Sequence, residues 1–237
     1  MSNKHLMIIC NGPSVKELVE YGFNSIPKHI DTVACSLAYR HFKEVNWWPT
    51  YYCLTDPKVL LHHKEAFQEM ILDPSNGIKK FFLSTKLPQL DIDIQFQDPF
   101  KRVVDTEWQV TGQAAFKVAL MHSYEYLYII GCDNRYYWDH SLVKPLNGTR
   151  KEDNRAIVIE DVLENPNYGI PNYLRKGDIT SWLFNHPDKS ITSSSNNKVW
   201  DELVAEAELK KIKIIDFSNS NLPVKTKEKS IIKFLAH

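Results

Sequence analysis

Short apolar segments recur along the chain, and each is followed by turn-forming residues. The first, residues 6–10, reads Leu-Met-Ile-Ile-Cys and leads into Asn11-Gly12-Pro13-Ser14. A continuous apolar run of this length indicates a strand that is buried on both faces. Ser14 is a good N-cap, and Glu17 follows at the spacing of a capping box, which predicts a helix after the turn. Strand, turn and helix in this order are typical of an α/β fold.

The same pattern continues downstream. Further strands are predicted at residues 32–36, 51–54, 80–83, 126–130 and 212–217. Helices are predicted at about residues 58–72, 112–122 and 197–210. Residues 91–96 alternate polar and apolar side chains, which is typical of a half-exposed strand. We therefore expect one α/β domain with a mostly parallel sheet, spanning residues 1–237.

Between about residues 134 and 196 the pattern changes. This stretch is aromatic and polar, with few apolar runs and several prolines. Long irregular segments inside compact domains are usually functional or disordered, and the aromatic content argues against disorder. We expect an insertion or lid over the sheet, carrying a short helix at 178–184. The lysine-rich tail after Pro223 is expected to be loosely held, and its charge would suit peripheral contact with a membrane surface.

Composition excludes some classes of partner. Lys and Arg number 29, as do Asp and Glu, so the net charge is zero. Nothing in this balance favours a nucleic acid backbone as a partner.

The four cysteines, Cys10, Cys35, Cys53 and Cys132, lie in or beside apolar runs and show no C-x-x-C spacing. We expect buried, reduced thiols rather than disulfides or a zinc site, and a cytoplasmic protein, because no apolar run is long enough to span a membrane.

Three turns follow or precede predicted elements at one edge of the expected sheet. They are Asn11-Gly12-Pro13-Ser14, Thr111-Gly112-Gln113 and Gly131-Cys132-Asp133. The carboxyl ends of parallel strands form the ligand site of open α/β sheets, and a helix N-terminus offers free N–H groups to an anion. Each turn could also be only a tight turn with a helix cap. Their convergence at one edge is what favours a nucleotide site.

The segment after Asp133 contains further candidates. An aspartate at a strand end can accept hydrogen bonds from ribose hydroxyls. Arg135, Tyr136 and Tyr137 follow directly, and guanidinium and phenol groups can hold a phosphate. In the alternative interpretation, Asp133 only forms the turn and the aromatic residues pack within the lid.

The run Ile8-Ile9-Cys10-Asn11-Gly12-Pro13-Ser14 resembles the opening of bacterial CMP-sialic-acid-dependent sialyltransferases of the single-domain type. It also resembles the related domain of motility-associated flagellin glycosyltransferases. Residues 109–133 and 212–217 agree with the family in order and spacing, so the resemblance covers nearly the whole chain. It implies a Rossmann-like, GT-A-like single domain that transfers a sialic or other nonulosonic acid from a CMP-sugar donor to a glycan acceptor, with inversion and without a metal or other cofactor. Homo-oligomerisation is left open.

The resemblance also implies roles for individual residues. The nucleotide site would comprise Asn11, Gly12, Pro13, Ser14, Ser36, Asp56, Thr111, Gly112, Gln113, Gly131 and Asp133. Ser36 and Asp56 depart from the family, which has Asn at both places. Arg135 with Tyr136 or Tyr137 would stabilise the leaving phosphate. The family's base is a lid histidine that deprotonates the acceptor hydroxyl, and here either His186 or His140 could fill that role.

Other sequence features indicate different functions. Asp91-Ile92-Asp93 could hold Mn²⁺ or Mg²⁺ against the diphosphate of a UDP- or GDP-sugar. Alternatively, the two aspartates only form the solvent-exposed face of an edge strand. His62 and His63 are not expected to face one metal ion together, because adjacent residues of a helix diverge, and both are expected to be solvated. The Gly-Pro-Ser opening also resembles an archaeal pterin pyrophosphokinase family. A nucleotide-binding module without catalysis is a further alternative.

Overall fold

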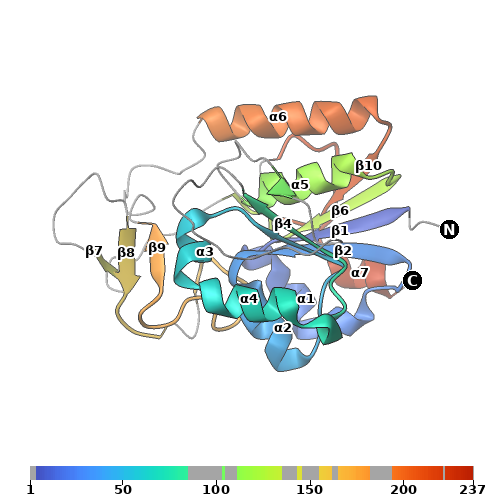
Figure 1. Ribbon diagram of the computed structural model, residues 1–237. Coiled ribbons are helices and arrows are strands. Elements are labelled where there is room, and N and C mark those ends of the chain that lie inside the picture. Colours follow the sequence, from blue (N-terminus) through green and yellow to red (C-terminus); the bar gives the residue numbers. More distant parts are fainter. Residues whose placement is uncertain are drawn as a thin grey trace.

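The computed structural model describes residues 4–84, 103–104, 111–134, 143–145, 155–161, 165–181, 194–220 and 222–236. An eight-stranded sheet forms its centre, in the order β11-β10-β6-β1-β2-β3-β4-β5 (Figure 1). Every neighbouring pair in it is parallel. The strands are β1 (His5–Ile9), β2 (Ile30–Cys35), β3 (Tyr51–Leu54), β4 (Lys80–Ser84), β5 (Val103–Val104), β6 (Tyr126–Ile130), β10 (Lys213–Asp216) and β11 (Thr226–Lys227). The chain therefore has the predicted Rossmann-like α/β fold.

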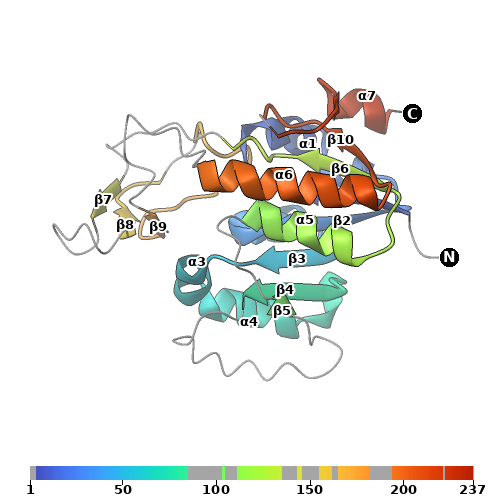
Figure 2. The same ribbon diagram turned by 90° about the horizontal axis from the view of Figure 1, so that it is seen from above.

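Helices cover both faces of this sheet (Figures 1 and 2). One face carries α5 (Thr111–Met121) and α6 (Ser194–Leu209). The other carries α1 (Lys16–Tyr21), α2 (Tyr39–Val45), α3 (Pro57–His62), α4 (Lys64–Leu72) and α7 (Ile231–Leu235). Short 3-10 helices span Pro13–Val15, Phe23–Ser25, Ser36–Ala38 and Pro74–Asn76. In the part of the chain that the structure describes, no helix is both long and apolar enough to cross a membrane.

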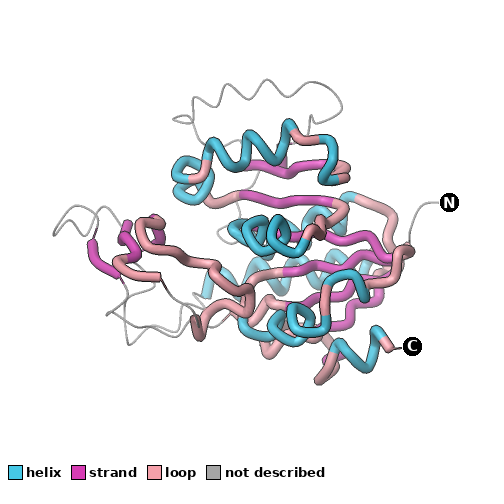
Figure 3. The backbone as a smooth tube through the Cα atoms, turned by 90° about the horizontal axis from the view of Figure 1, so that it is seen from below, coloured by secondary structure: helices cyan, strands magenta, loops and turns pink. Residues whose placement is uncertain are grey.

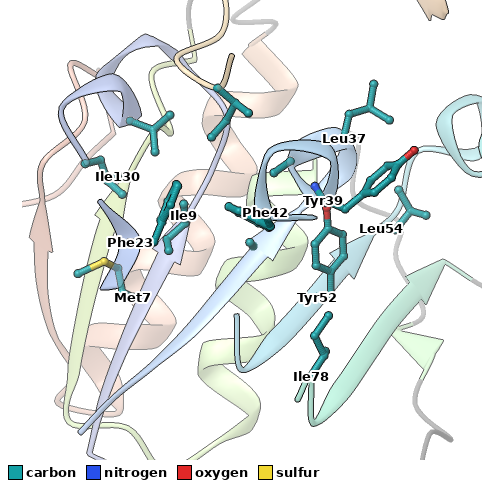
Figure 4. Packing of buried hydrophobic residues seen from close by; sticks show 14 of the residues in the cluster. Met7, Ile9, Phe23, Leu37, Tyr39, Phe42, Tyr52, Leu54, Ile78 and Ile130 are labelled. Carbon is teal, nitrogen blue, oxygen red and sulfur yellow. The ribbon is translucent and has the colours of Figure 1, made fainter. Parts of the chain in front are cut away.

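The apolar runs form strands because both sides of the sheet are covered. In β1, Leu6 and Ile8 pack against α5 and α6, whereas Met7 and Ile9 pack on the opposite face. Figure 4 shows the packing on this opposite face, where Ile9 lies close to Phe23, and Tyr52 lies close to Tyr39. Strands buried on two faces need continuous apolar sequence, and this is why the run 6–10 does not alternate.

A second, small sheet lies beyond the carboxyl edge of the main sheet (Figures 1 and 3). It consists of β7 (Val143–Pro145), β8 (Arg155–Val158) and β9 (Ile179–Ser181), all antiparallel. The helix predicted at 178–184 is therefore wrong. Gly177 has a φ of +90°, and the Val158 amide donates to the carbonyl of Asp178 at 2.9 Å, so this segment begins a paired strand instead.

Three further sequence predictions need correction. Glu17 does not close a capping box with Ser14; its carboxylate instead accepts hydrogen bonds from Ser230 Oγ and the Ile231 amide. These contacts hold the start of α7 against α1. The tail after Pro223 is thus not loosely held, and Ile231 is fully buried. The predicted helix 58–72 is divided into α3 and α4 at His63.

Gly131 ends β6 at a point where no side chain fits. Its φ is +75°, and a Cβ there would lie 2.3 Å from the Cys10 carbonyl oxygen. Gly77 has a similar φ of +70° but open space around it. We predict that Gly131→Ala lowers the free energy of unfolding by about 3 kcal/mol or more, from steric overlap added to backbone strain.

The matched control is Gly77→Ala, which should cost only the strain, about 1 kcal/mol. Urea unfolding of both variants measures the difference. Equal losses in the two variants would show that the close approach at Gly131 has no energetic consequence.

Candidate functional site

The candidate site lies at the carboxyl edge of the sheet, where β1 and β6 are neighbours. The chain leaves β1 towards β2 on one side and returns to β6 on the other. Such a reversal of strand order opens a crevice outside the strand ends, which is where open α/β sheets bind ligands. The turn at residues 11–14 follows β1, and the turn at residues 131–133 follows β6. Two of the three predicted turns therefore meet at this point.

Asp133 joins the turns around this crevice. Its Oδ2 accepts hydrogen bonds from the Ser14 amide at 3.1 Å and Ser14 Oγ at 2.8 Å, and its Oδ1 accepts one from the Asn219 amide at 3.1 Å. Ser14 Oγ accepts in turn from the Gly131 amide at 3.0 Å. The side chain is 5% exposed. Sequence reasoning predicted a ribose contact for Asp133 and missed that it ties together the ends of β1, β6 and β10.

Gly12 is required by this arrangement for steric reasons. A Cβ on Gly12 would lie 2.3 Å from Asp133 Oδ2 and 2.6 Å from the Gly131 carbonyl oxygen. The Gly12 amide donates to that carbonyl at 2.8 Å. A Cβ on Gly112 would lie 3.0 and 3.2 Å from the thiol sulfurs of Cys132 and Cys10. Gly12 therefore lets the backbones of the two turns approach each other, and Gly112 leaves room for the two thiols.

Three hydroxyl groups converge beside the crevice from different elements. Thr111 Oγ1, at the start of α5, lies 3.1 Å from Thr55 Oγ1 and 3.4 Å from Ser36 Oγ. Ser36 follows β2 with a φ of +56°, a conformation that asparagine tolerates better than most residues. Sequence reasoning identified Ser36 and Thr111 but missed Thr55. The only signal for Thr55 was its position directly after a predicted strand.

The insertion covers the first turn. The Gly169 amide donates to the Asn11 carbonyl at 3.0 Å. Asn11 Nδ2 donates to Tyr173 Oη at 3.1 Å and to the Cys35 carbonyl at 3.2 Å. The rings of Tyr168 and Tyr173 stack with centroids 4.0 Å apart. Residues 165–173 thus lie directly against residues 11–14, and sequence reasoning had named none of these insertion residues.

A buried ion pair anchors the same insertion segment to α2. Arg40 donates to both carboxylate oxygens of Asp178, at 2.5 and 2.8 Å, and to the Tyr173 carbonyl at 3.0 Å. Burial acts to raise the pKa of Asp178, but hydrogen bonds from Arg40 and the Arg175 amide hold that pKa below its usual value. Asp178 is therefore ionised at neutral pH and paired with Arg40.

The remaining candidates divide into two groups. Asp56 follows β3 and is partly buried; its carboxylate lies 3.5 Å from the Val59 amide at the start of α3. Gln113 is fully buried within α5. The candidates that lie outside the described residues are Asp91, Asp93, Arg135, Tyr136, Tyr137, His140 and His186.

The four cysteines lie on neighbouring strands or directly after them, and all are buried free thiols. Hydrogen bonding between the thiols of Cys10 and Cys132, together with burial, raises the pKa of Cys10. Burial raises the pKa of Cys53 in the same way. The expectation of buried, reduced thiols is confirmed, and a protonated thiol is a poor nucleophile.

Comparison with known proteins shows a distant structural likeness. No family model matches the chain, and no curated protein matches it. A solved structure that resembles it is a MAf glycosyltransferase from Magnetospirillum magneticum AMB-1, with a TM-score of 0.47 and 13% sequence identity. The alignment covers 100% of this chain and 37% of that protein. A likeness this distant does not assign an activity to the chain.

We predict that Asp133→Ala lowers the free energy of unfolding by about 2–4 kcal/mol, because three hydrogen bonds to a buried carboxylate are lost together. Asp73 provides a matched control. Its carboxylate accepts from the Ser75 amide and Oγ at 2.9 and 2.6 Å on the exposed surface, so Asp73→Ala should cost about 1 kcal/mol. Chemical denaturation compares the two. A loss for Asp133→Ala no larger than for Asp73→Ala would contradict the role assigned to Asp133.

Proposed function

We propose that the chain is a glycosyltransferase that moves a sialic acid or another nonulosonic acid from a CMP-activated donor to a glycan hydroxyl. The observation that carries this proposal is the meeting of residues 11–14 and residues 131–133 at the switch point of the sheet. Both turns belong to segments on which the resemblance to CMP-sialic-acid-dependent transferases depends, residues 8–14 and 109–133. Their contact at one crevice supports a common ligand for both.

The groups around the crevice suit a nucleotide monophosphate. The first backbone N–H groups of α5 have no partner within the helix and carry the positive end of its dipole, which favours a phosphate. The hydroxyls of Ser36, Thr55 and Thr111 lie beside that helix end and can donate to phosphate or ribose oxygens. The Asp133 carboxylate already accepts three hydrogen bonds from the protein. We propose that its remaining lone pairs accept a hydrogen bond from a ribose hydroxyl.

The chemical step would be an inverting displacement without a metal. The acceptor oxygen attacks the anomeric carbon as CMP leaves from the opposite side, and a base takes the hydroxyl proton. We propose His186 or His140 as this base. Arg135 with Tyr136 or Tyr137 would stabilise the negative charge that develops on the departing phosphate.

Calorimetry with CMP, UDP, GDP and ATP tests the donor class directly. We expect CMP to bind best and to do so equally well in the presence of EDTA. Tightest binding of UDP, and only with Mn²⁺, would replace this proposal with a metal-dependent transferase using Asp91 and Asp93. Preference for ATP with metal would favour pyrophosphokinase chemistry, and CMP binding without sugar transfer would favour a binding module.

Thr111→Val tests the hydroxyl cluster while preserving side-chain shape. We predict a roughly tenfold loss of CMP affinity, because one hydrogen bond to a charged ligand is removed. Thr226→Val is the control, since Thr226 is exposed on β11 at the sheet's edge. Titration calorimetry gives both constants. The same affinity in the two variants would remove the α5 terminus from the nucleotide site.

Arg135→Ala tests the phosphate contact. We predict that it weakens CMP binding roughly ten- to a hundredfold and cytidine binding much less, because only CMP carries the phosphate. Comparing the two ligands on one variant separates a phosphate contact from a general disturbance of the site. An equal loss for cytidine and CMP would show that Arg135 does not contact the phosphate.

A further inference from the structure

Two adjacent histidines and an aspartate of the insertion converge beside α3. The Nε2 atoms of His62 and His63 lie 3.9 and 3.6 Å from Oδ1 of Asp178, and one ligand atom from each residue lies within 4.8 Å of the others. The sequence prediction that these adjacent histidines cannot face one metal ion is wrong, and His63 is buried, whereas His62 is exposed as predicted. It assumed a continuous helix, but α3 ends at His62 and His63 has non-helical dihedrals (φ −111°, ψ 24°) before α4 begins.

We propose that His62, His63 and Asp178 form a binding site for a divalent transition-metal ion of the Zn²⁺ class, which ties the insertion to the corner between α3 and α4. Two imidazole nitrogens and one carboxylate oxygen suit Zn²⁺, Co²⁺ or Ni²⁺, whereas Mg²⁺ and Ca²⁺ prefer oxygen ligands alone. Three protein ligands leave a coordination position for water. The ion would be structural, and the proposed transfer reaction does not use it.

The observed distances are close to those that such a site needs. Ligand atoms about 2.1 Å from a tetrahedral Zn²⁺ lie about 3.4 Å from one another. The separations of 3.9 and 3.6 Å from Asp178 approach this value. The two imidazole rings are nearly perpendicular, with an interplanar angle of 88° and centroids 4.8 Å apart. The ligand atoms of the three residues lie within 4.8 Å of one another, and rotation of the rings would bring them onto one ion.

An observation independent of these distances also points to a ligand. The His63 side chain is only 8% exposed. Its Nε2 atom is buried and has no hydrogen-bond partner among the described residues. A buried nitrogen without a partner destabilises the fold, and a metal ion would satisfy it. Burial, reinforced by the charge of Arg40, lowers the pKa of His63 to about 4.

The surrounding groups orient the three ligands. His63 Nδ1 lies 3.4 Å from Tyr39 Oη, so a metal-bound His63 would donate its Nδ1–H to Tyr39. Arg40 fixes the carboxylate plane of Asp178 through two hydrogen bonds. The positive charge of Arg40 also repels a dication and lowers the affinity of the site. His62 is 31% exposed and gives the ion a route from solvent.

Zinc titration of the full-length protein, stripped with EDTA and dialysed, tests this proposal. We expect one equivalent of Zn²⁺ to bind and to raise the Tm, because an ion that binds only the folded state stabilises it. His62→Gln should lower the affinity at least about tenfold and abolish the shift in Tm. His29→Gln is the control. His29 is exposed and directly precedes β2, at the amino end of the sheet, so its loss should change neither the affinity nor the shift in Tm.

Cobalt provides a second readout that does not depend on stability. Co²⁺ bound by two imidazoles and a carboxylate should give visible absorption bands in the wild type and in His29→Gln, and these should be lost in His62→Gln. Wild type that binds neither ion, or His62→Gln that binds both as tightly as wild type, would overturn the proposal. No nucleotide is present in these titrations, so their outcome is independent of the proposed transferase activity.

Discussion

The close contact between the turns after β1 and β6 is the constraint on which the candidate site depends. Gly12 and Gly131 bring two backbones together, and the carboxylate of Asp133 holds them there through Ser14. Asn219 connects the turn after β10 to the same carboxylate. Three strand ends are thus fixed relative to one another by one buried side chain. A crevice built in this way can present backbone groups to a ligand without first being ordered by that ligand.

Much of the fold could be predicted from the sequence because the relevant signals are local. The run Leu-Met-Ile-Ile-Cys at residues 6–10 is buried on both faces, and such runs are distinctive. The convergence of the turns at residues 11–14 and 131–133 followed from the parallel topology alone. The predicted capping box failed because each partner found a better contact far away. Ser14 Oγ donates to Asp133, and Glu17 binds the start of α7.

The features that were missed depend on contacts between distant segments. Tyr173 and Gly169 gain their positions only when the insertion packs on residues 11–14. His63 converges with His62 because the helix breaks between them, and the sequence around them contains neither glycine nor proline to mark that break. Asp178 was assigned to a helix, although its backbone pairs with β8 and its carboxylate with Arg40. No local pattern identifies a pairing of residues 138 positions apart.

Tyr173 connects the candidate nucleotide site with the proposed metal site. Its hydroxyl accepts from Asn11 Nδ2 at the first turn, and its carbonyl accepts from Arg40, which in turn holds Asp178. Asn11, Tyr173 and Arg40 are all mostly buried, and close-packed interiors transmit displacements rather than absorbing them. A shift of the insertion segment that moves Asp178 must therefore also move the Tyr173 hydroxyl, which accepts the hydrogen bond from Asn11. An ion at His62, His63 and Asp178 would restrict that shift, and so hold residues 165–173 in one position over the candidate nucleotide site.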